Sequence, residues 1–116
     1  MQKRLKKIIL ASSSLSRRKI FKNVGIFFSY KNPKINEDKY KKIFKKRKYS
    51  VIRITKELAK LKCLSVTKSN KKSLVIGCDT MVELNGLFFD KAKNRKDAKK
   101  ILKKLSGREH NIYTSV

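Results

Sequence analysis

The stretch from Ile8 to Phe21, IILASSSLSRRKIF, brings hydroxyl groups and two guanidinium groups together within a few residues. An apolar run leads into three serines, and Arg17 and Arg18 follow where a helix is expected to begin. Free backbone N–H groups, hydroxyls and the positive end of a helix dipole at such a turn suit an anion. The arginines add donors that match a phosphate. An ordinary strand–helix connection with a serine cap and two solvated arginines explains the same residues.

Two further charged residues suit phosphate chemistry. Asp79 directly follows the apolar run LVIG, and ligands gather at the carboxyl ends of strands in open α/β sheets. A carboxylate placed there can hold a divalent metal or accept a proton from water. Lys91 follows a hairpin pattern and could meet a phosphate. Taken singly, such an aspartate is commonly a turn or cap residue and such a lysine commonly faces solvent, but with the serine–arginine turn they form a set.

The elements that must position these residues alternate between strand and helix patterns. The periodicity predicts helices over 14–23, over 51–66 and from a cap at Asn94 to a stop at Gly107. It predicts strands over 5–10, 26–30, 74–77 and 110–116, and a hairpin of 81–84 and 87–89 around Asn85-Gly86. The segment 32–48 is polar and is assigned no element. We therefore expect an α/β fold with a mixed, partly parallel sheet and flanking helices, in which 5–10 and 74–77 are neighbouring central strands.

Length and composition indicate a single globular domain. The chain has 116 residues, of which 40% are hydrophobic and 35% charged, which excludes a disordered chain. No apolar run approaches the ~20 residues of a membrane span. The N-terminal apolar run is shorter than the ~7–15 residues of a secretory signal, so we expect a cytoplasmic protein without membrane contact. Cys63 and Cys78 lack metal-site spacing and are expected to be reduced, structural thiols.

The charge of the chain has two explanations. Lysine and arginine number 33 against 8 acidic residues, a net charge of +25. Such an excess prompts a nucleic-acid hypothesis, with KKIFKKRKY at 41–49 as the densest candidate. However, the excess is mostly lysine spread along the chain. Because lysine has AT-rich codons, an AT-rich genome would produce such an excess on the surface of any protein. We favour a solvated lysine-rich surface, whose positive charge attracts polyanionic ligands. Non-specific nucleic-acid binding through this surface remains the alternative.

Six short motifs lie in order along nearly the whole chain: ASSSLSRR from Ala11, INE from Ile35, LAKLKC from Leu58, GCDTMV from Gly77, DKA from Asp90, and LSGREH from Leu105 with TSV after it. This set resembles the Maf family of nucleoside triphosphate pyrophosphatases. Three positions depart from the family pattern, since Leu15 and Ala92 replace prolines and Asn36 replaces an aspartate.

The resemblance implies a Maf/inosine-triphosphatase-like fold and hydrolysis of a nucleoside triphosphate to the monophosphate and pyrophosphate. It implies a divalent metal, Mg²⁺ or alternatively Mn²⁺, held by Glu37 and Asp79, with Asp79 also the catalytic residue that activates water. The residues that it assigns to the substrate are Ser12, Ser16, Arg17, Arg18, Lys62, Thr80 and Lys91. Ser16 and Thr80 match positions where subfamilies differ in base preference. Thr80 is typical of the dTTP/UTP-directed group, whereas Ser16 and the spacing around Leu58–Cys63 are similar to other branches.

Members of the family continue past the motif that TSV matches. We therefore expect residues 1–116 to be the N-terminal portion of a Maf-like domain, truncated at the C-terminus, with an exposed sheet edge and apolar face. We also expect little turnover from this chain alone. The alternatives are an inactive truncated relative and a basic nucleic-acid-binding protein. A homodimer is compatible with the sequence.

Overall fold

The computed structural model describes residues 6–116, so Leu5, the first residue of the strand predicted over 5–10, lies outside the described part. Strands and helices alternate along the described chain, which confirms the α/β class. The helices are α1 (Leu15–Asn23), α2 (Glu37–Lys46), α3 (Val51–Thr67) and α4 (Arg95–Leu105). The strands are β1 (Ile8–Ala11), β2 (Ser29–Lys31), β3 (Leu74–Gly77), β4 (Asp79–Leu84), β5 (Leu87–Phe89) and β6 (Asn111–Ser115).

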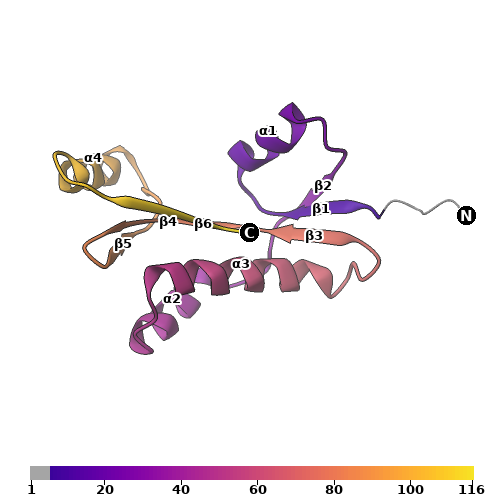
Figure 1. Cartoon of the computed structure of the whole chain (residues 1–116), viewed down its shortest axis with the longest axis horizontal. Coiled ribbons are helices and arrows are strands. Elements are labelled where there is room, and N and C mark those ends of the chain that lie inside the picture. The colour runs from indigo at the N-terminus through magenta and orange to yellow at the C-terminus, as the bar shows by residue number, and fades with distance from the viewer. Residues whose placement is uncertain (1–5) are drawn as a thin grey trace, which may run out of the picture.

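The six strands form one parallel and one antiparallel sheet (Figure 1). The parallel sheet has the order β2-β1-β3 and the antiparallel sheet the order β5-β4-β6. Only Cys78 separates β3 from β4, so the two sheets follow one another along a molecule that measures 57 × 33 × 23 Å. The expected parallel and antiparallel pairings and the flanking helices are present, but the prediction of one mixed sheet is wrong, because the parallel and the antiparallel strands form separate sheets.

The predicted pairing of β1 with β3 is confirmed, but β3 is not a central strand. Ile8 to Ala11 lie opposite Leu74 to Gly77 in parallel register. Within residues 6–116, however, β3 forms the edge of its sheet, and Leu74 is 51% exposed. The apolar residues of β3 are explained by α3, which packs against one face of the strand. A strand covered in this way need not have partner strands on both edges.

Helix α3 lies along both sheets (Figure 1), and within residues 6–116 it supplies more buried apolar residues than any other element. It begins at an N-cap, Ser50, whose hydroxyl accepts the N–H of Arg53, and it buries Ile54 and Leu58 almost completely. One core cluster joins α3 to α2 and β4, and consists of Phe44, Val51, Ile54, Leu58 and Met81. A second cluster joins the end of α3 to β1, and consists of Ile9, Ala11 and Val66. The core therefore holds α3 against the strands that carry the predicted site.

Gly77 allows β3 to approach α3 closely. A Cβ atom at this position would lie 2.6 Å from the carbonyl oxygen of Ala59 and 2.8 Å from the Cβ and N atoms of Cys63. Real Cβ atoms essentially never come this near to backbone, so only glycine fits without a shift of the helix. This contact lies two residues before Asp79 and fixes the start of β4 beside the middle of α3.

Two predictions between β1 and α3 are wrong. Helix α2 occupies part of the segment 32–48 that was assigned no element. Its signals are a capping Asn36, acidic residues in the first turn and the apolar spacing of Tyr40 and Phe44, which the many lysines obscure. Strand β2 covers Ser29–Lys31 and not 26–30, because it pairs with β1 only from Ser29 onward.

The C-terminal elements agree closely with prediction. Asn85 and Gly86, with φ of 51° and 82°, form the tight turn between β4 and β5, although β4 begins at Asp79, two residues earlier than expected. Asn94 caps α4 by accepting the N–H of Asp97, and Gly107 follows the helix with φ of 70°. The predicted last strand is β6, which pairs antiparallel with β4.

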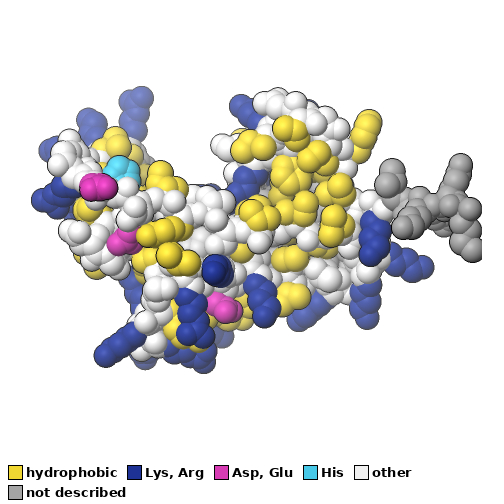
Figure 2. Space-filling view, viewed as in Figure 1, with side chains coloured by type: hydrophobic (Ala, Val, Ile, Leu, Met, Phe, Trp, Pro, Cys, Tyr) yellow, Lys and Arg dark blue, Asp and Glu magenta, His cyan; other side chains and the backbone are white. Residues whose placement is uncertain are grey.

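Helix α1 leaves Leu15 and Ile20 largely in solvent, whereas Phe21 is half-buried against Phe28. Ser14 caps it as predicted and accepts the N–H of Arg17. Leu15 is 69% and Ile20 59% exposed, and Figure 2 shows hydrophobic side chains gathered over α1 and the neighbouring β1 and β3. The expected exposed sheet edge and apolar surface are therefore both present. No helix within residues 6–116 has the length and apolar content needed to cross a membrane.

Candidate active site

The structure joins Asp79, Glu37 and Lys62 in one ion cluster. The Nζ atom of Lys62, on α3, lies 2.8 Å from Glu37 Oε1 and 2.9 Å from Asp79 Oδ1. Glu37 is the first residue of α2 and Asp79 the first residue of β4, so three elements contribute one side chain each. The sequence-based expectation that Asp79 and Glu37 lie near one another is confirmed by the ammonium group that they share.

The Asp79 carboxylate is only half satisfied. The residue is 5% exposed, and its Oδ2 atom is buried without a hydrogen-bond partner among residues 6–116. Burial raises the pKa of Asp79 above its ordinary value of 3.8, although the hydrogen bond and charge of Lys62 act in the opposite direction. An unpartnered buried oxygen costs free energy, which a ligand in the site would recover.

Glu37 differs from Asp79 in both exposure and charge state. Its side chain is 38% exposed. Partial burial acts to raise the pKa of Glu37, but the hydrogen bond from Lys62 and the charges of Lys62, Lys41 and Lys91 outweigh it and hold the pKa below 4.5. The cluster therefore contains one easily ionised carboxylate and one that retains its proton to higher pH.

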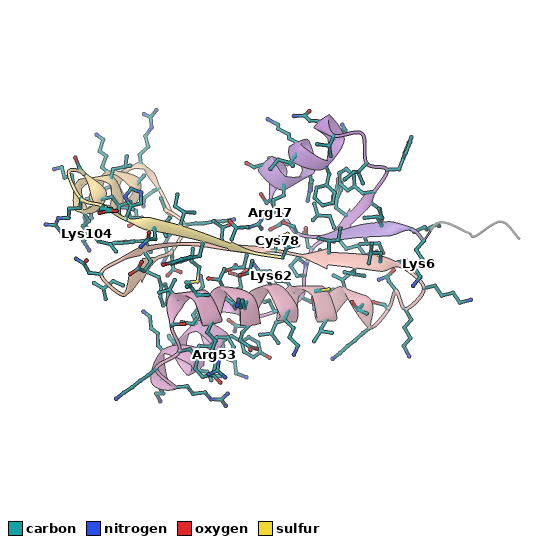
Figure 3. The ribbon with its side chains drawn as sticks, viewed as in Figure 1. Lys6, Arg17, Arg53, Lys62, Cys78 and Lys104 are labelled. Carbon is teal, nitrogen blue, oxygen red and sulfur yellow. The ribbon has the colours of Figure 1, made fainter. Side chains whose placement is uncertain are left out.

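Arg17 ties the serine turn to the start of β4. Its Nη2 donates to Thr80 Oγ1 at 2.9 Å, and its Nη1 donates to the Cys78 carbonyl at 3.4 Å and to Ser12 Oγ at 3.5 Å. Figure 3 shows Arg17 above the strands, Lys62 below them where α3 lies, and Cys78 between the two. The hydrogen bonds to Cys78 and Thr80 thus place the Arg17 guanidinium group beside the residues on either side of Asp79.

The serine hydroxyls of the turn mainly accept backbone N–H groups at the start of α1. Ser12, buried immediately after β1, accepts the N–H of Ser14, and Ser14 accepts the N–H of Arg17. Two of the N–H groups that were considered for anion binding therefore already have hydroxyl partners. Ser12 still contacts Arg17, so the first motif and the Asp79 motif meet through this arginine.

Thr80 connects Arg17 to the last strand. Its hydroxyl lies 2.9 Å from the hydroxyl of Thr114 on β6, and the residue is exposed. The TSV motif near the end of the chain therefore reaches the same site as the serine turn. Thr114 was not among the predicted site residues, although its motif was part of the family resemblance.

Three predicted substrate residues do not join the hydrogen-bonded cluster. Arg18 places its guanidinium 3.5 Å above the ring of Tyr30, and its Nε is buried without a partner. Ser16 is exposed in the first turn of α1, with no side-chain hydrogen bond to the cluster in the described part of the chain. Lys91 is exposed after β5, where its charge still contributes to the lowered pKa of Glu37.

The sequence reasoning missed Lys41 and Asp90 as members of the ion cluster. Lys41 Nζ lies 2.7 Å from Asp90 Oδ1 and 3.8 Å from Glu37 Oε2. Burial acts to lower the pKa of Lys41, but the Asp90 hydrogen bond and the charges of Asp90, Glu37 and Asp79 raise it above 10.5. The spacing of Glu37 and Lys41 by four residues is a helical ion-pair signal, which was lost because α2 was not recognised.

Comparison with known proteins gives matches over nearly the whole chain. The sequence model of the family described as Maf-like protein matches residues 7–116. A nucleoside triphosphate pyrophosphatase of Pelagibacter ubique is 34% identical over 97% of this chain and 57% of its own length. Two proteins named dTTP/UTP pyrophosphatase are also similar. The Dictyoglomus thermophilum protein is 34% identical over 96% of this chain and 55% of its own length. The Thermotoga maritima protein is 39% identical over 95% of this chain and 51% of its own length.

The chain spans about half the length of the curated relatives it matches. The family match nevertheless extends over nearly all of its residues, and it contains every member of the ion cluster and of the Arg17 contacts. The similarity suggested by the six motifs is thus found independently across the whole fold. The chain belongs to the family of Maf-like proteins.

Proposed function

We propose that this chain carries the catalytic residues of a nucleoside triphosphate pyrophosphatase, which splits the α–β phosphoanhydride into a monophosphate and pyrophosphate. The observation that carries the proposal is the buried Asp79 carboxylate, held at Oδ1 by Lys62 and unpartnered at Oδ2. A carboxylate that is positioned but half satisfied suits a group that must accept a proton or a cation during a reaction. The names of the relatives support the same reaction.

The residues present fit a divalent metal such as Mg²⁺. Asp79 Oδ2 is a buried oxygen in need of a partner, and Glu37 shares the same ammonium group. Hard oxygen ligands suit Mg²⁺, which commonly takes one or two carboxylates and completes its shell with water and substrate phosphates. Among the described residues, no group of three or more acidic, cysteine or histidine side chains is gathered for a metal. When bound, the metal would neutralise phosphate charge.

Each side chain of the site has its own role in the proposed reaction. Asp79 accepts a proton from the water whose oxygen attacks the α-phosphorus, while the α–β bond breaks and pyrophosphate leaves. The raised pKa of Asp79 makes its carboxylate a stronger base than an ordinary aspartate. Lys62 holds this carboxylate in place, and Arg17 and Lys91 supply positive charge to the phosphates.

The base preference that we propose is for pyrimidine nucleotides such as dTTP and UTP. Several relatives are named for these two substrates. By the family resemblance, Thr80 matches the residue typical of the dTTP/UTP-directed group. In this chain Thr80 bonds to both Arg17 and Thr114, so its hydroxyl lies beside the proposed phosphate contacts. Ser16 is the second residue that we assign to base preference.

Release of pyrophosphate tests the proposal. The chain is assayed with dTTP, UTP and ATP in the presence of Mg²⁺, both alone and mixed with the part of the Thermotoga maritima relative that this chain does not cover. We expect Asp79→Asn to abolish release and chelation to do the same, because the amide accepts no proton and balances no metal charge. Asp38→Asn, on the exposed side of α2, is the matched control.

Two outcomes would reject the proposal. Release that persists in Asp79→Asn would remove Asp79 from the reaction. If neither the chain nor the mixture releases pyrophosphate, while the chain binds DNA or RNA with an affinity that collapses as salt rises, the basic nucleic-acid-binding alternative is favoured instead.

A further inference from the structure

Charged side chains of alternating sign form a continuous row from the buried carboxylate to the segment that follows β5. In order they are Asp79, Lys62, Glu37, Lys41 and Asp90, and each neighbouring pair lies within 3.8 Å. The two oxygens of Glu37 face different ammonium groups, since Oε1 lies 2.8 Å from Lys62 and Oε2 lies 3.8 Å from Lys41. The last contact, between Lys41 Nζ and Asp90 Oδ1, is the shortest at 2.7 Å. The row therefore joins the ion cluster to the segment after β5.

Asp90 attaches the segment 90–94 to α2. Within residues 6–116, its contact with Lys41 is the one side-chain hydrogen bond that joins this segment to a distant element. The Lys41 side chain is only 17% exposed, so it is held against the protein, whereas Asp90 is 59% exposed. A charge-assisted bond with one partly buried partner is stronger than an ion pair in open solvent. The contact therefore restricts where the residues next to Asp90 can lie.

Lys91 is the residue that this restriction affects first, because it directly follows Asp90. Its charge reaches the ion cluster. Although burial acts to raise the pKa of Glu37, nearby ammonium groups hold it below 4.5, and that of Lys91 is one of them. Lys91 lies in no helix or strand, and in the described part of the chain it makes no side-chain hydrogen bond or ion pair of its own. Its position therefore depends on its neighbour.

We propose that Lys41 and Asp90 are positioning residues, which hold Lys91 beside the ion cluster, where its ammonium group meets the phosphates of a nucleoside triphosphate. This inference rests on the proposed function, because it takes the phosphates to lie beside Asp79. Neither positioning residue binds the substrate itself, since Lys41 already has two carboxylate partners and the Asp90 carboxylate would repel a phosphate. The benefit is pre-organisation, because a lysine whose backbone is already placed loses less freedom when a phosphate binds.

The sign of one substitution separates positioning from simple electrostatics. Asp90→Ala removes a negative charge near the proposed phosphates, which by charge alone should strengthen triphosphate binding. Positioning predicts the reverse, a loss of about fivefold, because Lys91 is released. The probe is a UTP analogue with a methylene group between the α- and β-phosphorus, which cannot be cleaved there, titrated calorimetrically with Mg²⁺. Asp38→Ala, which removes an exposed negative charge from the first turn of α2, is the charge-matched control and should not weaken binding.

A double substitution tests whether Asp90 acts through Lys91. We expect Lys91→Ala to weaken binding of the analogue by about tenfold, and Asp90→Ala/Lys91→Ala to bind no more weakly than Lys91→Ala alone. Lys41→Met should cost as much as Asp90→Ala, whereas Lys41→Arg, which keeps a charged donor for Asp90, should retain most of the affinity. Additive losses in the double variant, or an Asp90→Ala variant that binds as tightly as the unsubstituted chain, would overturn the proposal.

A measurement without ligand follows the position of Lys91 directly. Backbone amide NMR relaxation should show greater mobility at Lys91 in Lys41→Met, whereas Lys42→Met, at the neighbouring exposed position of α2, should leave it unchanged. Unchanged mobility at Lys91 in Lys41→Met would overturn the proposal. The proposed hydrolysis is judged separately, because pyrophosphate release that persists in Asp79→Asn rejects the hydrolysis and does not alter the mobility of Lys91.

Discussion

The ammonium group of Lys62 lies 2.9 Å from the carboxylate of Asp79, and their side chains are 10% and 7% exposed. This contact ties the middle of α3 to the first residue of β4. Because both charges are removed from water, each depends on the other, and the Glu37 carboxylate shares the same ammonium at 2.8 Å. The pair therefore contributes to folding as well as to the proposed chemistry.

Removal of the Lys62 charge should destabilise the fold. We expect Lys62→Met to lower the free energy of unfolding at pH 7 by about 3 kcal/mol, because a buried carboxylate loses its partner. The loss should shrink at pH 3.8 and below, because the raised pKa of Asp79 lets its carboxyl keep a proton there. Urea denaturation at both pH values measures this. Lys60→Met, at an exposed position of the same helix, should change stability by less than about 0.5 kcal/mol. Equal effects of the two substitutions would show that the ion pair stabilises little.

Gly77 is expected to tolerate no side chain. Gly77→Ala brings a Cβ atom within 2.6 Å of a backbone oxygen of α3, so the helix or the strand must move. Overpacking of this kind costs about 1–3 kcal/mol, and it should also displace Asp79 from Lys62. Thermal unfolding together with a nucleotide titration measures both effects. Gly86→Ala, where a Cβ meets nothing within 4 Å, should show only the cost of the left-handed backbone at φ of 82°, which Gly77 does not share. An unchanged Gly77→Ala variant would contradict the close packing.

The protonation of Asp79 should respond to Glu37. Burial raises the pKa of Asp79 above 3.8, and the negative charge of Glu37 raises it further. The native state therefore holds this proton more tightly than the unfolded chain, so the stability it contributes is complete below pH 3.8 and is lost as pH rises through the folded pKa. We expect Glu37→Gln to lower the pKa of Asp79, as followed by carboxyl NMR. Glu109→Gln, at an exposed position after α4, should leave it unchanged. A rise in Glu37→Gln would refute the assigned coupling.

Arg17 should contribute specifically to phosphate binding. We expect Arg17→Ala to weaken triphosphate binding by about 1.5–3 kcal/mol, the size of a lost hydrogen bond to a charged group. Lys45→Ala, on the exposed part of α2, should have only a salt-sensitive effect. Calorimetric titration of a nucleotide into each variant measures both. Equal losses would favour diffuse attraction by the basic surface.

Local signals in the sequence predicted most of the elements. The caps Ser14 and Asn94 and the turn Asn85-Gly86 act through hydrogen bonds and dihedral preferences within a few residues, so their positions could be read directly. Helix α2 was missed although it has the same kinds of signal, because lysines surround its short apolar face. The site residues Glu37 and Lys62 were named by the resemblance to a family, since neither periodicity nor charge distinguishes them from the other charged residues of the chain.

Packing between distant segments decided how the site is assembled. Lys62 meets Asp79 across 17 positions of sequence, and Lys41 meets Asp90 across 49, so no local pattern contains either pair. The same holds for the adjacent arginines, because Arg17 turns toward Thr80 whereas Arg18 stacks on Tyr30. Each contact depends on where the backbone of another element lies, and that position follows from the burial of α3 against the strands and from the missing side chain at Gly77.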